Sequence, residues 1–123
     1  MISWSREDLA WAAGLFEGEG TITMRRQAQR GYSYEYWGLA IAMTDEDVVR
    51  RFHEVIELGR VTGPVPTKGG QPIYIWRSSS QPDIYAVLAA LYPWLGGRRR
   101  SRAEECLRDL GSRQMRARNR RVA

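Results

Sequence analysis

The chain has 123 residues, of which 43% are hydrophobic and 27% are charged, and its formal net charge is +5. This length and composition predict one globular domain and exclude a disordered or collagen-like chain, and we expect neither a transmembrane helix nor a signal peptide. A single cysteine, Cys106, and a single histidine, His53, exclude an internal disulfide, a multi-cysteine zinc site and a serine-type catalytic triad, so a metal ion would need oxygen ligands.

The positive charge favours a polyanionic partner, and nucleic acid is the first candidate. Lys68 is the only lysine, so nearly all of the basic residues are arginines. Arginine suits phosphate because its planar fork can donate two parallel hydrogen bonds. Codon usage in a GC-rich genome is an alternative explanation for arginine over lysine.

The N-terminal half of the chain predicts a helix, a β-hairpin and a second helix. Ser5 and Asp8 form a capping box before a helix over residues 6–18. Residues 20–27 alternate polar and apolar side chains, as a half-buried strand does, and a turn at 28–33 leads to a more buried strand at 34–43. The next helix lies within 44–59, with Thr44 or Asp45 as its cap.

The C-terminal half predicts a second hairpin and two more helices. The hairpin strands are residues 60–66 and 72–78, joined by a glycine turn around 68–70. A helix within 80–95 begins near Pro82 and ends near Pro93, and a last helix within 98–111 stops at Gly111. We therefore expect one domain over residues 1–111, and a basic, flexible tail over residues 112–123.

The predicted order α-β-β-α-β-β-α-α indicates an α+β fold. Each hairpin is followed by a helix that can cover its apolar face, which leaves the other face of one antiparallel sheet free. Polar side chains of the kinds that hydrogen-bond DNA bases are expected on that free face: Thr23, Arg25, Gln27, Lys68, Gln71 and Arg77. A solvated sheet face is the alternative interpretation of the same residues.

The first helix carries small residues and two acids in an unusual pattern. Ala10, Gly14 and Gly18 form a stripe of minimal side chains, and each interior glycine costs about 1 kcal/mol relative to alanine, which the close approach of another helix would offset. Glu17 and Glu19 point to nearly opposite sides of the helix end, so they cannot form an acid–base pair within one chain. A carboxylate at a helix C-terminus favours a nearby cation, of which a divalent metal is the simplest, although solvated end residues are the alternative.

The segment AAGLFEGEG, residues 12–20, followed by the strand TITMRRQ, resembles the signature of the LAGLIDADG homing endonucleases. Residues 42–61 resemble that family's second helix and the strand end before it, and residues 91–107 resemble its segment leading into the final helix. The resemblance covers nearly all of residues 8–111. It implies the α-β-β-α-β-β-α fold of that family, with an antiparallel saddle-shaped sheet and the helices on one face.

The resemblance also implies an assembly and a metal site. Because only one motif is present, the chain is expected to form a homodimer through Ala10, Trp11, Gly14 and Gly18. Glu19 matches the motif's metal ligand, and Gly18 is expected at the same site. Mg²⁺ is the expected ion, with Mn²⁺ or Ca²⁺ able to occupy the site, whereas Glu17 matches an acid with a structural role.

Weaker matches assign further roles around the metal. Asp45 falls where relatives place a polar residue beside the hydrolytic water, although a helix cap is an equal alternative. Arg98 falls where they place a basic residue near the scissile phosphate. Arg99 and Arg100 could take that role if the alignment slips by one residue, and we also expect both to contact DNA.

The expected function is therefore that of a magnesium-dependent, site-specific DNA endonuclease. It would make a staggered double-strand break at a long, near-palindromic target in double-stranded DNA, as in intron or intein mobility. The alternative is a catalytically inactive nucleic-acid-binding protein of the same fold, such as an intron-splicing maturase or a transcriptional regulator. We expect an intracellular protein without a membrane partner, in the cytoplasm or nucleoid of a bacterium or phage host, with an organelle as the alternative.

Overall fold

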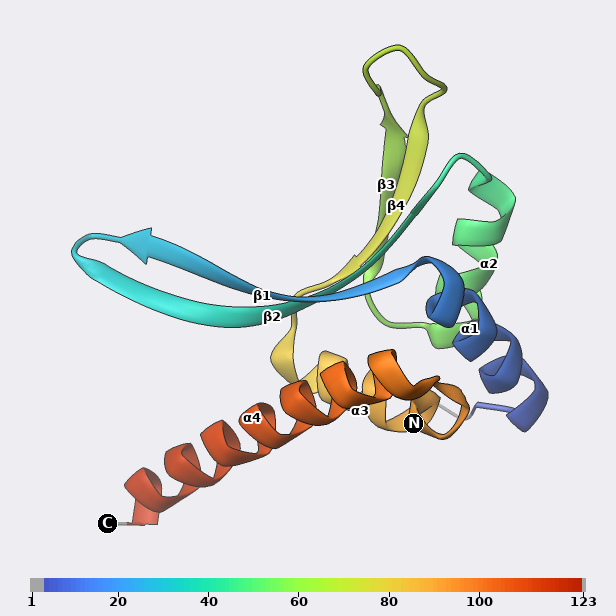
Figure 1. The fold of residues 1–123 in the computed structure, drawn as a ribbon. Helices are drawn as coiled ribbons and strands as arrows, with labels where there is room; N and C mark the ends of the chain where they lie inside the picture. The colour runs from blue at the N-terminus through green and yellow to red at the C-terminus, as the bar shows by residue number, and fades with distance from the viewer. Residues whose placement is uncertain (1–3, 123) are drawn as a thin grey trace.

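The computed structural model describes residues 4–122 and shows one sheet with helices on one side (Figure 1). The elements in chain order are α1 (Arg6–Glu19), β1 (Gly20–Gln29), β2 (Tyr32–Met43), α2 (Glu46–Ile56), β3 (Arg60–Val65), β4 (Ile73–Ser78), α3 (Gln81–Leu91), the 3₁₀ helix η1 (Tyr92–Trp94) and α4 (Gly97–Val122). This order confirms the predicted α+β fold. None of the helices in this part of the chain is long and apolar enough to cross a membrane.

The four strands form one antiparallel sheet in the order β1-β2-β4-β3. The β1–β2 and β3–β4 hairpins diverge strongly, so the sheet is curved, as expected for a saddle (Figure 1). The helices gather on one side of it, and the other side carries no helix of the described chain. The expected free face of the sheet is therefore present.

Large aromatic side chains fill the space between the sheet and the helices. Trp37 and Trp76 project from the covered face of the sheet, and Phe16 of α1 and Phe52 of α2 meet them from the helices; all four are buried. Phe52 and Trp76 pack edge to face with their ring centres 4.8 Å apart. The Trp76 indole N–H donates to the Leu58 carbonyl at 2.9 Å, so burial of this ring leaves no unpaired donor.

Local contacts fix both ends of α1, including the point where the chain passes into β1. The Ser5 hydroxyl caps α1 by accepting from the Asp8 N–H at 3.1 Å, which is one half of the predicted capping box. At the other end, a Cβ placed on Gly20 would lie 2.5 Å from the Phe16 ring. Only glycine therefore lets the chain leave the helix over this buried ring, and Glu19 is fixed at the last position of α1.

The last helix is longer than predicted. The expected stop at Gly111 is wrong, because α4 continues through it, and the segment expected to be a flexible tail is helical as far as Val122. An interior glycine weakens a helix by about 1 kcal/mol but does not end it. Here the Asp109 carboxylate and the Arg113 guanidinium form an ion pair of 2.8 Å across Gly111, which supports the helix at this point.

Candidate nucleic-acid interface and metal site

The uncovered face of the sheet brings four of the predicted contact residues together. Thr23 lies opposite Gly38, Arg25 opposite Tyr36, and Gln27 opposite Tyr34. Residues directly opposite in an antiparallel pair share a face, and side chains two apart along a strand do so too. Ala40 of β2 lies opposite Thr21 on one side and opposite Arg77 on the other. The side chains of Thr23, Arg25 and Gln27 on β1 therefore share the uncovered face with Arg77 on β4.

Lys68 and Gln71 lie apart from that row. Both are exposed in the loop between β3 and β4, at the far end of that hairpin (Figure 1). The Thr67 hydroxyl donates to the Gln71 carbonyl at 2.7 Å and closes the loop. The predicted contact residues therefore divide between a central face and one loop.

The structure adds residues that the sequence interpretation missed. Arg60 of β3 lies opposite Arg77. Arg25, Arg60 and Arg77 together line a hollow of about 630 Å³ on the uncovered face. Asp83 is the one acidic residue among the described residues that line this hollow. Tyr34 and Tyr36 of β2 share this face. The alternation in residues 34–43 did contain the signal for both tyrosines, whereas Arg60 depends on the strand register, which a single sequence does not reveal.

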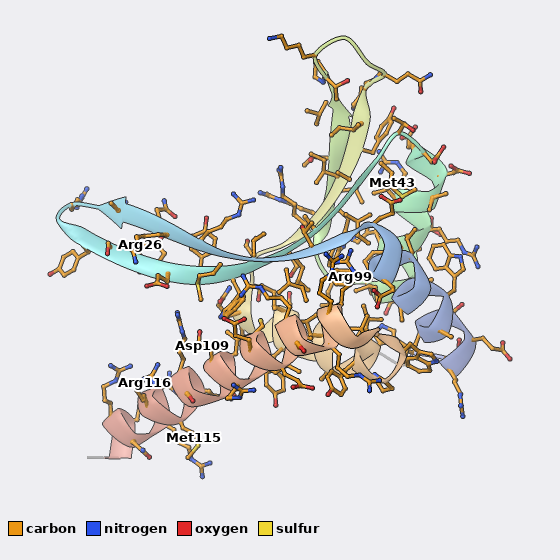
Figure 2. The ribbon with its side chains drawn as sticks, in the orientation of Figure 1. Arg26, Met43, Arg99, Asp109, Met115 and Arg116 are labelled. Carbon is orange, nitrogen blue, oxygen red and sulfur yellow. The ribbon has the colours of Figure 1, made fainter. Side chains whose placement is uncertain are left out.

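The two acids at the end of α1 have different surroundings. The Glu17 carboxylate accepts from the Gly96 N–H and lies 3.4 Å from Arg99 Nε, with 38% of its side chain exposed. Arg99 also donates from Nε to the Glu17 carbonyl at 2.6 Å and from Nη1 to the Gly20 carbonyl. Glu17 and Arg99 therefore join the end of α1 to the start of α4, and this part of the molecule is labelled by Arg99 in Figure 2.

Glu19, in contrast, is exposed, and its side chain makes no hydrogen bond or ion pair within residues 4–122. It lies directly before Gly20, which pairs with Ile41 near the end of β2. The predicted Asp45 follows that strand end and precedes α2, so the topology brings both acids to the same end of the sheet. The Asp45 backbone carbonyl accepts from Val48 and Val49 at 3.2 Å, but its side chain makes no cap hydrogen bond, so the carboxylate does not serve as the helix cap.

The three consecutive arginines at the start of α4 also differ in the partners of their side chains. Arg98 is exposed, and its side chain makes no hydrogen bond or ion pair to another described residue. Arg99 is engaged as described above, and Arg100 donates to the Pro93 carbonyl at 3.1 Å while its guanidinium lies 5.0 Å from the Tyr92 ring centre. Of these three arginines, only Arg98 therefore has a guanidinium with no partner among the described residues.

These surroundings limit how a metal ion could be held. Within residues 4–122 no group of three or more histidine, cysteine, aspartate or glutamate side chains gathers as a cation site. The Glu19 carboxylate and the Gly18 carbonyl at the same helix end are oxygen donors, which suit a hard divalent cation. Because fewer than three such side chains gather at this place within the described chain, the remaining ligands would come from outside it.

The small residues of α1 face outward. Gly14 and Gly18 are exposed, and apart from their chain neighbours and the nearby backbone of α1, no described atom lies within 4 Å of a Cβ placed on either. The same side of α1 borders a hollow that Ala10, Trp11, Gly14 and Leu15 line together with Asp47, Val48 and Arg51 of α2. The Arg51 guanidinium lies 4.0 Å from the Trp11 ring centre. The close helix approach that the glycines predict is therefore not made by any helix of residues 4–122.

Comparison with known proteins gives matches in structure alone. No protein-family model matches the chain, and no curated protein sequence matches it. Its fold matches the homing endonuclease I-CvuI in complex with a DNA target and Mg, with a TM-score of 0.72 and 17% identity over 87% of this chain and 69% of that one. It matches the group I intron-encoded homing endonuclease I-CeuI complexed with DNA, with a TM-score of 0.77 and 12% identity over 97% of this chain and 61% of that one. The LAGLIDADG homing endonuclease I-GzeII in complex with its DNA target gives a TM-score of 0.74 and 10% identity over 93% and 38% of the two chains.

Proposed function

The chain has the fold of the LAGLIDADG homing endonucleases, and from this premise we propose that it is a DNA endonuclease of that kind, acting as a homodimer with a divalent metal ion. One observation carries the proposal. The only motif acid left free within the described chain, Glu19, lies at the end of α1 where the uncovered, arginine-lined sheet face begins.

The sheet face supplies the chemistry for a DNA partner. Arg25, Arg60 and Arg77 provide positive charge for phosphates, and Gln27 and Thr23 are types that hydrogen-bond base edges in the major groove. Binding that neutralises several phosphates depends steeply on salt. We therefore propose double-stranded DNA as the partner, with Lys68 and Gln71 extending the contact at the β3–β4 loop.

The exposed glycines of α1 support the homodimer. Two copies of α1 that meet at Gly14 and Gly18 could approach closely, because no side chain separates the backbones. Ala10 and Trp11 border the same surface. A twofold axis through this contact would place the two Glu19 residues of the dimer on either side of it, one for each DNA strand.

The residues that would hold the metal ion are the Glu19 carboxylate and the Gly18 carbonyl, completed by DNA phosphate oxygens and the second copy. A bound Mg²⁺ ion polarises a phosphoryl oxygen and lowers the pKa of water, which is the chemistry that hydrolysis of a phosphodiester needs; Mn²⁺ or Ca²⁺ fits the same oxygen donors. Arg98 would neutralise charge on the scissile phosphate, and the uncapped Asp45 carboxylate would orient the attacking water. Glu17 and Arg99 keep the end of α1 in place.

The test is cleavage of a randomised double-stranded DNA library by the purified protein, with magnesium and with EDTA. The proposal expects magnesium-dependent cuts at a long, near-palindromic sequence, with staggered ends. Specific binding without any metal-dependent cleavage would instead identify an inactive DNA-binding protein of this fold. Absence of both binding and cleavage would overturn the proposal altogether.

A further inference from the structure

The β1–β2 hairpin extends well past the strand that supports it. Pairing between β2 and β4 ends at Leu39 and Ser78, whereas β1 and β2 continue to pair as far as Gln29 and Tyr32. Beyond Leu39 the hairpin is therefore a two-stranded ribbon, and its β2 edge has no neighbouring strand (Figure 1). An isolated two-stranded hairpin is marginally stable in water.

Side chains from α3 and α4 take over the pairing along this open edge. The Trp37 N–H donates to Gln81 Oε1 at 2.9 Å, and Gln81 Nε2 donates back to the Trp37 carbonyl at 3.0 Å. Two residues further along, Arg113 Nη1 donates to the Glu35 carbonyl at 2.6 Å. In an antiparallel strand, alternate residues turn their backbone groups to the same edge, so these bonds continue the line of pairing that β4 leaves at Leu39.

α4 also binds the covered face of the same ribbon. The Trp37 indole N–H donates to Asp109 Oδ2 at 2.8 Å, and that carboxylate pairs with Arg113 Nε at 2.8 Å. The Arg102 guanidinium lies 4.8 Å from the Trp37 ring centre and donates from Nε to the Ile22 carbonyl at 3.2 Å. Figure 2 shows Asp109 on the side of α4 that faces the hairpin.

We propose that Gln81, Asp109 and Arg113 are positioning residues that fix the direction of the β1–β2 hairpin and so determine how it reads the outer base pairs of a DNA target. The hairpin presents Arg25 and Gln27 on its uncovered face, whereas the three positioning residues hold it from its edge and its covered face. They act through the backbone and through Trp37 rather than on DNA. The inference rests on the proposed function for its consequence in DNA reading, but not for its structural content.

The structural content is tested by amide hydrogen exchange in the full-length protein without DNA. Gln81→Ala and Arg113→Ala should each make the amides of residues 25–36 exchange about five- to tenfold faster, the ratio expected for one lost hydrogen bond of ordinary strength. The amides of β3 should not change. Arg113→Lys keeps a donor for the Glu35 carbonyl and should restore much of the protection.

Matched controls come from the same helix. Gln114→Ala and Arg116→Ala remove exposed side chains that make no hydrogen bond or ion pair to another described residue, and they should leave exchange unchanged. Equal protection in Arg113→Ala and Arg116→Ala would overturn the proposal. Arg113 is partly exposed on α4, so this substitution leaves the buried core intact even if Gln81→Ala does not fold.

The consequence for DNA is tested on the target that the wild type selects from a library. Arg113→Ala should raise KM several-fold and leave kcat at saturating DNA unchanged. The variant should also cleave targets with substitutions at the base pairs farthest from the centre of the target more readily than the wild type does. A uniform loss of cleavage over all positions, or unchanged tolerance, would contradict positioning. If the wild type selects no DNA, the proposed function fails, and the exchange result still decides whether these side chains hold the hairpin.

Discussion

Exchanging each motif acid for its amide should separate a structural glutamate from a catalytic one. Glu19 is exposed, has no partner in the described chain and lies at a helix C-terminus, where a negative charge is unfavourable by about 0.3–1 kcal/mol. Glu19→Gln should therefore leave the free energy of unfolding unchanged or slightly higher. Glu17→Gln should lower it by about 1 kcal/mol, because it removes the charge that faces Arg99 and weakens the bond from the Gly96 N–H at a partly exposed position.

For a domain of this size, about 1 kcal/mol corresponds to a shift of roughly 3–6 °C in Tm, which thermal denaturation followed by circular dichroism resolves. The two substitutions should affect cleavage in the opposite order, with the larger loss for Glu19→Gln. Glu19→Gln should keep DNA affinity and lose cleavage by about 10³-fold or more, as expected when several kcal/mol of metal-assisted stabilisation is removed. Glu17→Gln should keep cleavage at temperatures where it is folded. A lower Tm for Glu19→Gln than for Glu17→Gln, or retained cleavage by Glu19→Gln, would refute the assignment.

Three further predictions concern the dimer surface, the buried thiol and a glycine contact. Gly14→Leu projects a side chain into open space in the single chain, so it should leave the fold intact and shift the protein to monomer in light scattering; a dimer of unchanged mass would contradict the α1 interface. Burial, and after it the nearby Asp109 charge, raises the pKa of the Cys106 thiol from 9.0 to about 12. The unfolded state therefore loses this proton at a lower pH than the folded state. The free energy of unfolding, measured by urea titration, should fall as the pH rises from about 9 towards 12. Cys106→Ala should flatten that part of the profile, and an unchanged slope would refute the cause. Gly59→Ala should destabilise by about 1–3 kcal/mol, because φ is +83° and the new Cβ would lie 2.6 Å from the Trp76 indole nitrogen, whereas Gly69→Ala, at a similar φ in open space, should cost less in the same denaturation assay.

The order of helices and strands could be predicted because local pattern and tertiary burial agree along most of the chain. The alternation in residues 20–27 places Ile22 in the core and Thr23 on the uncovered face, and the acidic first turn of α2 is an equally local signal. The end of α4 was predicted incorrectly because Gly111 is a strong local stop signal. Of the contacts that support the helix there, the Arg113–Asp109 pair is local, because the two residues lie four apart, whereas the bond from Arg113 to the Glu35 carbonyl joins residues that only the fold brings together.

The candidate site divides in the same way. The sequence could identify Glu19 as an acid in an unfavourable position at a helix end, and the structure leaves it free. It could not distinguish Arg98 from Arg99, because Arg99 donates to the carbonyls of Glu17 and Gly20, about 80 residues away in the chain. Arg100 donates to the nearer Pro93 carbonyl, and that bond depends on how the chain turns between α3 and α4. The contribution of Arg60 likewise depends on the β3–β4 register.

The most direct test of the account uses mixed dimers in which one copy is wild type and the other carries Glu19→Gln, purified through two different tags. The substrate is a supercoiled plasmid that carries the target selected by the wild type. Two wild-type copies should linearise the plasmid in magnesium, the mixed dimer should nick one strand only, and two altered copies should leave it supercoiled. Linear product at the wild-type rate, from either the mixed dimer or the doubly altered dimer, would contradict the claim that each Glu19 serves one DNA strand.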